Sequence, residues 1–140
     1  SRVVDARHES FDFLGFTFRR EWNDRRKCCV TLFYPSVKSQ KRLRGKLKKT
    51  LSAMIPVKLA EQVRRANQIL RGWVNYFRIG HSSRVFHKIR WHAEMKVRRL
   101  LQRRAKRYGC GWKRYDADFL YGKLGLYDDY RVRWLPVRRA

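Results

Sequence analysis

The sequence predicts a mainly α-helical domain, in which a three-helix bundle follows a short antiparallel β-hairpin and precedes an irregular aromatic tail. Three observations predict this architecture. Aromatic residues alternate near the N-terminus, apolar residues recur at helical spacing in three successive stretches, and the last part of the chain combines glycines with many aromatic residues. The 140 residues are enough for one domain of ordinary size, or for two small subdomains that share a core.

The first element is the hairpin. In FDFLGFTF, residues 11–18, phenylalanines occupy alternate positions, and their register shifts across Leu14 and Gly15. This shift indicates a bulge or a close backbone approach at the glycine. The polar residues 22–27 predict a turn, and residues 28–34 are rich in β-formers. We therefore expect two antiparallel strands.

A first helix should begin at Pro35 and Ser36, which are typical helix-start residues. We expect Pro56 to close it. Its apolar line consists of Leu43, Leu47 and Leu51, with Met54 near the same face.

The second helix carries the clearest amphipathic pattern in the chain and should end at Gly80, a C-cap glycine. Its apolar line is Leu59, Val63, Ala66, Leu70, Trp73 and Phe77. Opposite this line, Arg64, Arg71 and Arg78 recur every seven residues, with Asn75 among them, so three guanidinium groups should project from one ridge. We assign Trp73 and Phe77 to the core and not to base stacking, because they share the line of Leu70.

A third helix should start at Ser82 or Ser83 and reach about residue 108. Its buried line is Phe86, Ala93, Val97 and Leu100, flanked by Ile89 and Leu101. Trp91 and Met95 point the other way and need their own cover, for which the aromatic tail, residues 112–134, is the candidate. Within the tail we expect one short helix near residues 119–124.

The charge of the chain indicates a polyanionic partner. Lysine and arginine number 36 against 11 acidic residues, for a formal charge of +25 and a pI near 11.2. Phosphates that meet these cations release condensed counterions, so nucleic acid is the first partner to consider. No run approaches the roughly 20 apolar residues of a spanning helix, and no signal peptide is recognisable, so we expect no membrane partner.

No catalytic or metal-binding constellation stands out. The three cysteines Cys28, Cys29 and Cys110 lack CxxC spacing, so we expect no disulfide framework, no zinc site and a reducing, intracellular compartment. The four histidines lack the i, i+4 spacing of a helical zinc site. The carboxylates of residues 116–118 and 128–129 are flanked by basic residues, so surface ion pairing explains them better than a metal does.

The basic helices carry the functional signal. A merely solvated helix face usually mixes acids with bases, yet residues 37–50 and 63–93 contain no acid. The lysines and arginines of these stretches repel one another, and this repulsion is explained if phosphate groups of a ligand usually lie next to them. No helix-turn-helix, zinc-finger or RRM pattern is present, which favours recognition of RNA shape over the reading of a DNA sequence.

Two stretches together resemble a known family. FDFLGFTF, and LRGWVNYFRIG at residues 70–80, resemble the C-terminal half of the reverse transcriptases encoded by bacterial and organellar group II introns, called maturases. The segment PSVKS at residues 35–39, like LRGWVNYF, is similar to the maturase-specific region of that family, and LYGKLGL at residues 120–126 is similar to the end of that region. The resemblance covers residues 11–126.

The resemblance implies two parts. Residues 1–35 would be the last palm β-hairpin, whose FLGF block is primer-grip-like at Phe13, Leu14, Gly15 and Phe16. Residues 36–140 would be the thumb, or domain X, a maturase-specific helical domain with its C-terminal tail, so the expected bundle is thumb-like. For contacts with RNA phosphates we select Lys38, Lys41, Arg42, Lys48, Lys49, Arg64, Arg71 and Arg78.

The implied function is to clamp group II intron RNA for splicing, and to hold the template-primer duplex in the parent enzyme beside an upstream finger/palm domain. Two alternatives remain: a subunit of a split reverse transcriptase, or a DNA-binding module that docks the parent protein on its target. The Y-A-D-D aspartates of the family are missing, so whether the chain is part of an active enzyme stays open. We expect no cofactor in this chain, with Mg²⁺ in the parent polymerase and the ribozyme, and a cytoplasmic (bacterial) or organellar location.

Overall fold

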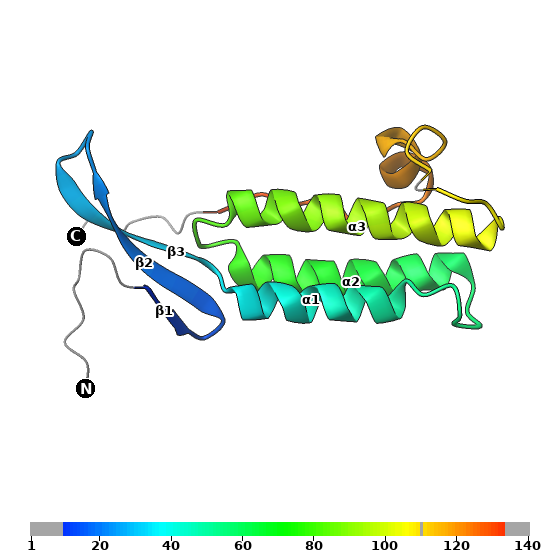
Figure 1. Cartoon of the computed structure of the whole chain (residues 1–140), viewed down its shortest axis with the longest axis horizontal. Helices are drawn as coiled ribbons and strands as arrows, with labels where there is room; N and C mark the ends of the chain where they lie inside the picture. The colour runs from blue at the N-terminus through cyan, green and yellow to red at the C-terminus, as the bar shows by residue number, and fades with distance from the viewer. Residues whose placement is uncertain (1–9, 110, 134–140) are drawn as a thin grey trace.

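A three-stranded sheet sits at one end of an elongated three-helix bundle in the computed structural model, which describes residues 10–109 and 111–133 (Figure 1). The strands are β1, Ser10–Phe13, β2, Phe16–Asn23, and β3, Cys28–Pro35, in antiparallel order β1-β2-β3. The helices are α1, Val37–Thr50, α2, Leu59–Phe77, and α3, Ser83–Arg104. α1 and α3 run in the same direction along the bundle (Figure 1). α2, which lies between them in the sequence, runs in the opposite direction. The predicted fold class is confirmed.

The sheet differs from the expected hairpin in one respect. Leu14 and Gly15 form a two-residue turn between β1 and β2, with φ of 52° and 85°, and Phe13 pairs with Phe16 across it. Positive φ at both turn residues matches the right-handed twist of the flanking strands. The expected bulge is therefore wrong: the FLGF segment forms the turn of the β1–β2 pair, which is present in addition to the expected β2–β3 pair. The expected close backbone approach at Gly15 is confirmed, because a Cβ there would lie 3.0 Å from the Ser39 hydroxyl oxygen.

α1 forms as the sequence predicts but ends earlier. Ser36 caps it by accepting a hydrogen bond from the Ser39 amide at 3.1 Å, and Leu43, Leu47 and Leu51 are all buried. The helix ends at Thr50 and not at Pro56. Met54 follows in the loop and is 90% exposed, so its expected place on the apolar line is wrong.

α2 buries Val63, Ala66, Leu70 and Phe77 of the expected line, whereas Leu59 and Trp73 are partly buried against the core. The helix ends at Phe77, three residues before Gly80. Gly80 serves close packing instead of capping: a Cβ at this position would lie 2.8 Å from the carbonyl oxygen of Phe33 on β3. The amide of the next residue, His81, donates to the same carbonyl at 2.6 Å. The sheet and the α2–α3 connection therefore pack backbone against backbone.

α3 ends at Arg104, four residues before the expected limit, and all the apolar residues expected to be buried on it are buried. The predicted short helix is present as η1, Asp118–Lys123, a single π-helical turn that buries Leu120. Cys110, one of the three cysteines considered above, lies outside the described residues.

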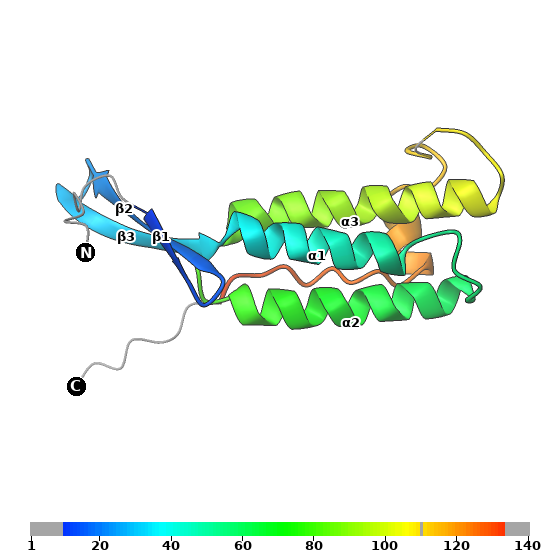
Figure 2. The same ribbon diagram turned by 60° about the horizontal axis from the view of Figure 1, so that its bottom comes forward.

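The tail returns along the whole bundle. After η1, residues 126–133, which we call the C-terminal strap, run back along the bundle toward the sheet end (Figure 2). The strap contacts α2 and α3: the Arg131 carbonyl accepts from Arg78 at the end of α2 at 2.8 Å, and the Tyr130 ring lies 6.4 Å from the Phe86 ring of α3. Leu126 and Tyr127 join the core. The Asn67 side chain on α2 donates to the Gly125 carbonyl and accepts from the Tyr127 amide, both at 2.8 Å. The expectation that the tail covers Trp91 is wrong: the strap packs against α2 and α3, and Trp91 stays 59% exposed.

Candidate nucleic-acid interface

The outward face of α1 is a dense array of cations. Because its three leucines point into the bundle, every lysine and arginine of this helix is exposed. None of them forms a salt bridge with a residue in the described part of the chain. They are Lys38, Lys41, Arg42, Arg44, Lys46, Lys48 and Lys49. The five of them selected from the sequence lie where free phosphates can reach them, and their contact with RNA stays a prediction.

The turn of the FLGF segment is fixed against two helices. The Leu14 carbonyl accepts a hydrogen bond from the Tyr76 hydroxyl of α2 at 2.6 Å. The Gly15 carbonyl accepts from the Ser36 amide at 2.8 Å and from the Ser39 hydroxyl of α1 at 2.9 Å. The turn therefore has its position set by both helices, although Leu14 itself is 68% exposed.

The four primer-grip-like residues fall into two groups. Phe13 and Leu14 are exposed, whereas Phe16 is buried against Phe77, with ring centroids 4.7 Å apart. Phe16 therefore anchors the sheet to the bundle. Whether the exposed pair positions a primer stays a prediction.

A groove of about 530 Å³ lies between this turn, α1 and α2. It brings the exposed turn next to two cations of α1, Arg42 and Lys46, and next to Trp73 and Tyr76 of α2. Tyr76 is 52% exposed. The groove thus combines guanidinium and ammonium groups with an aromatic wall, which suits a sugar-phosphate backbone with accessible bases.

Sequence reasoning found only part of this groove. Phe77 is in the core, as expected, and Trp73 packs on it with centroids 4.6 Å apart while also lining the groove. Lys46 and Tyr76 were not among the selected residues. The available signal for Tyr76 was its place off the apolar line of α2, where a large aromatic side chain must lie outside the core.

The ridge of α2 is less cationic than its arginines suggest. Arg64 binds the Glu61 carboxylate through two hydrogen bonds of 2.8 and 2.5 Å, and Arg65 reaches the same carboxylate at 3.2 Å. The hydrogen bond from Arg64 is the main reason why the pKa of Glu61 falls from 4.5 to about 2. Further along, the Arg71 guanidinium lies 5.9 Å from the centre of the Tyr127 ring, so this part of the ridge meets the C-terminal strap.

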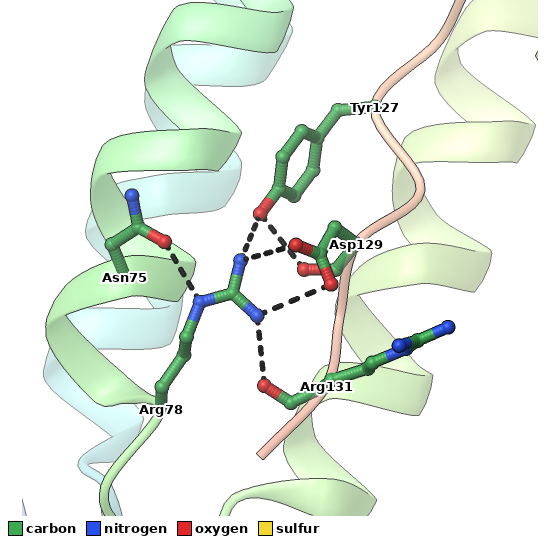
Figure 3. A network of polar contacts seen from close by, with 5 residues as sticks. All are labelled: Asn75, Arg78, Tyr127, Asp129 and Arg131. Atoms are coloured by element: carbon green, nitrogen blue, oxygen red, sulfur yellow. Dashed lines mark hydrogen bonds and ion pairs between the residues drawn. The ribbon is translucent and has the colours of Figure 1, made fainter. Parts of the chain in front are cut away.

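Arg78 lies inside the protein. Its side chain is 8% exposed, and it joins α2 to the C-terminal strap (Figure 3). The guanidinium donates to the Asn75 side chain at 2.7 Å, the Tyr127 hydroxyl at 2.6 Å, the Asp129 carboxylate at 3.1 Å and the Arg131 carbonyl at 2.8 Å. Burial by itself would raise the pKa of Asp129. The hydrogen bond and the charge of Arg78, together with the Arg131 backbone and the charge of Arg133, outweigh burial and lower that pKa.

The expectation that Arg78 projects from the ridge with Arg64 and Arg71 is therefore wrong. The three arginines do recur every seven residues, but Arg78 follows the last residue of α2. At this position its side chain points toward the C-terminal strap and binds it. A guanidinium with this many partners inside the protein has little left to offer a phosphate.

Two acidic residues of the tail, Asp116 and Asp129, also have structural partners. Asp116 accepts a hydrogen bond from the Phe119 amide at 2.9 Å, at the start of η1, and Asp129 pairs with Arg78. Across residues 10–109 and 111–133, no group of three or more histidine, cysteine or acidic side chains could hold a metal ion. None of the described helices is both long and apolar enough to span a membrane.

One family comparison agrees with this geometry. A family model described as the maturase-specific domain of group II introns matches residues 40–117, which is more than half of the chain. The matched segment begins within α1, contains all of α2 and α3, and ends just before η1. A comparison with curated proteins gave no match.

Proposed function

The chain belongs to the family of group II intron maturase-specific domains, and from this premise we propose that it binds group II intron RNA and assists splicing by holding the folded ribozyme. The RNA supplies the splicing chemistry. The protein supplies a rigid cationic surface against which the RNA backbone is held.

The observation that carries this proposal is the array of unpaired cations on α1. Seven exposed lysines and arginines lie on a 14-residue helix, and none has a carboxylate partner among the described residues. Like charges at helical spacing repel one another, and a phosphate backbone removes this repulsion while it releases counterions. The Gly15 contacts of Ser36 and Ser39 fix the start of α1, so the array is presented without further ordering.

The groove next to α1 supports a second part of the proposal. The exposed FLGF turn, Arg42, Lys46 and Tyr76 would face a nucleic-acid backbone together, which fits a template-primer duplex in the parent enzyme. In this proposal the parent polymerase and the ribozyme hold the Mg²⁺ ions, because the sequence lacks the Y-A-D-D aspartates.

The edge of the sheet supports a contact with an upstream finger/palm domain. Phe11 and Phe13 on the edge strand β1 are 62% and 59% exposed. An edge strand with exposed aromatic residues offers both backbone hydrogen-bonding groups and apolar area to a neighbour. In a split reverse transcriptase the same edge would receive the partner subunit.

The test compares two matched triple variants. In the first, Lys41, Lys48 and Lys49 of α1 are replaced by glutamine. In the second, the exposed cations of the β2–β3 turn, residues 25–27, are replaced in the same way. Binding of a fluorescent group II intron transcript is measured by fluorescence anisotropy at several KCl concentrations from about 50 to about 300 mM. Over this range, affinity that depends on phosphate contacts falls steeply with salt.

We expect the α1 variant to lower the slope of log affinity against log salt by about 2 to 3, because each lost phosphate contact removes about 0.7 to 0.9. The turn variant should leave the slope unchanged. Equal slopes in the two variants would contradict the assignment of α1. Tighter binding of the unaltered protein to duplex DNA than to the folded transcript would contradict the maturase function and favour the DNA-docking alternative.

A further inference from the structure

A second hollow lies on another face of the bundle, between α1 and α3, and contains none of the residues selected from the sequence. Its volume is about 520 Å³. α1 contributes Gln40 and Arg44, and α3 contributes His87, Lys88, Trp91 and His92. The C-terminal strap packs against α2 and α3, and none of its residues lines this hollow.

Trp91 gives the hollow a flat aromatic wall. The core line of α3 passes through Phe86, Ile89 and Ala93, so the indole two residues before Ala93 points away from the core and is 59% exposed. An exposed indole at a hollow is a stacking surface that accepts any base, because every base has a π face.

Cations surround this wall and continue along the bundle. Arg44 and Lys88 line the hollow itself. α1 and α3 run in the same direction (Figure 1), so Lys48 of α1 and Lys96 of α3 both follow further along their helices. The charge of Lys48 acts on Lys96, so the two ammonium groups are neighbours. None of these four forms a salt bridge within the described part of the chain.

The acid nearest in sequence is turned elsewhere. Glu94, the one carboxylate of α3, binds Arg90, Arg98 and the Tyr121 hydroxyl on the tail side. This face of the bundle therefore keeps an uncompensated positive field. In agreement, the pKa of Lys96 is lowered, first by partial burial and then by its neighbours Arg99, Lys48 and Arg103.

His92 adds a polar group of a different kind. Burial, followed by the nearby Lys96, Arg44 and Arg99, lowers the pKa of this histidine, which favours the neutral imidazole. Its Nε2 atom is covered and has no hydrogen-bond partner in the part of the chain that the structure describes. Covered polar atoms normally have a partner, so a ligand that presents a donor or acceptor here would satisfy one.

We propose that the hollow between α1 and α3 binds an unpaired nucleotide of the RNA, with its base stacked on Trp91 and its flanking phosphates on Arg44 and Lys88. The backbone then continues along Lys48 and Lys96. This inference rests on the proposed function, because it names the part of the intron RNA that this face recognises. A paired base in a duplex cannot reach the indole, so the ligand is a bulge, loop or single strand.

The experiment compares Trp91→Ala with Trp91→Phe and with a matched control, Trp22→Ala, since Trp22 on β2 is 60% exposed and remote from the hollow. The probes are a fluorescent oligouridylate and a blunt RNA duplex of equal strand length, measured by anisotropy at one salt concentration. Thermal unfolding by circular dichroism establishes that each variant is folded.

Trp91→Ala should weaken binding of the single strand roughly 5- to 100-fold, which corresponds to the loss of one stacked base. Binding of the duplex should change less than about twofold, because it depends on phosphate contacts alone. Trp91→Phe should retain most of the single-strand affinity, and Trp22→Ala should resemble the unaltered protein.

Two results would overturn the proposal. One is a Trp91→Ala protein that binds the single strand as tightly as the unaltered protein, or that loses single strand and duplex affinity equally. The other is competition by polyglutamate of equal charge as effective as that by oligouridylate, which would indicate an acidic protein as the occupant. In either case, tight binding of the intron transcript by the unaltered protein would leave the proposed function in place, whereas its failure would remove both.

Discussion

Replacing Arg78 by methionine should destabilise the protein by about 3 kcal/mol. The substitution keeps most of the aliphatic stem and removes a guanidinium that is 8% exposed and has four partners within the protein. Breaking a buried pair costs about 3 to 5 kcal/mol, but the Asp129 side chain is 43% exposed and can be solvated again, which places the value at the lower end of that range. The Tyr127 hydroxyl keeps its bond to the Asp129 carbonyl at 2.8 Å, which also limits the loss.

The assay is urea unfolding followed by circular dichroism, with Arg71→Met as the control. Arg71 lies on α2, seven residues before Arg78, and is exposed with one contact to the Tyr127 ring, so its loss should cost less than about 1 kcal/mol. The pH dependence has a defined sign. Because the pKa of Asp129 is lowered in the folded protein, the contribution of this pair is present above the unfolded value and is lost as pH falls through the folded one. Losses that agree within about 0.5 kcal/mol in the two variants would refute this reasoning.

Three further predictions concern local geometry. Gly80→Ala should destabilise the protein by about 1 to 3 kcal/mol, because the new Cβ would lie 2.8 Å from a β3 carbonyl, whereas Gly72→Ala, which meets nothing within 4 Å, should stabilise it in the same urea assay. Ser36→Ala should cost about 1 kcal/mol through the lost cap of α1, and Ser36→Thr should restore most of it. The Glu61 carboxyl should titrate near pH 2 by NMR, and Arg64→Gln should move the midpoint toward 4.5; a midpoint that stays near 2 would contradict the assigned cause.

The helices could be predicted because their spacing alone defines a buried face. Leu43 and Leu47 on α1, or Leu70 and Phe77 on α2, repeat at 3.6-residue periodicity, and all four are buried. The same periodicity places the lysines of α1 on the outside. The cationic face of the candidate site therefore follows from local pattern, which needs no knowledge of distant contacts.

The FLGF turn could not be predicted in the same way. Leucine rarely adopts a positive φ, so Leu14 did not suggest a turn residue. Its conformation is sustained by a hydrogen bond from Tyr76, 62 residues later in the chain. A tertiary contact of this kind cannot be recognised in the local sequence. The shift in the register of the phenylalanines across Gly15 was equally compatible with a β-bulge.

The path of the tail was beyond sequence reasoning for a related reason. The C-terminal strap has no regular period, so nothing assigns it to a particular groove. Its place is set by hydrogen bonds from Asn67 and Arg78 and by the burial of Leu126 and Tyr127. The path of the strap determines that Arg78 is buried. It also determines that Trp91 stays exposed, because the strap does not cover it.

The path of the C-terminal strap also determines the shortest segment of the chain that contains the whole core. The segment that matches the family model stops at residue 117, before Leu120, Leu126 and Tyr127 enter the core, and it starts after Phe16 has closed the opposite end. A polypeptide limited to these residues would keep the pattern by which the family is identified. It would expose to water the apolar groove that Leu126 and Tyr127 fill, and it would leave the Arg78 guanidinium without its Asp129 partner. The signature by which the family is identified is therefore narrower than the segment that contributes to the core.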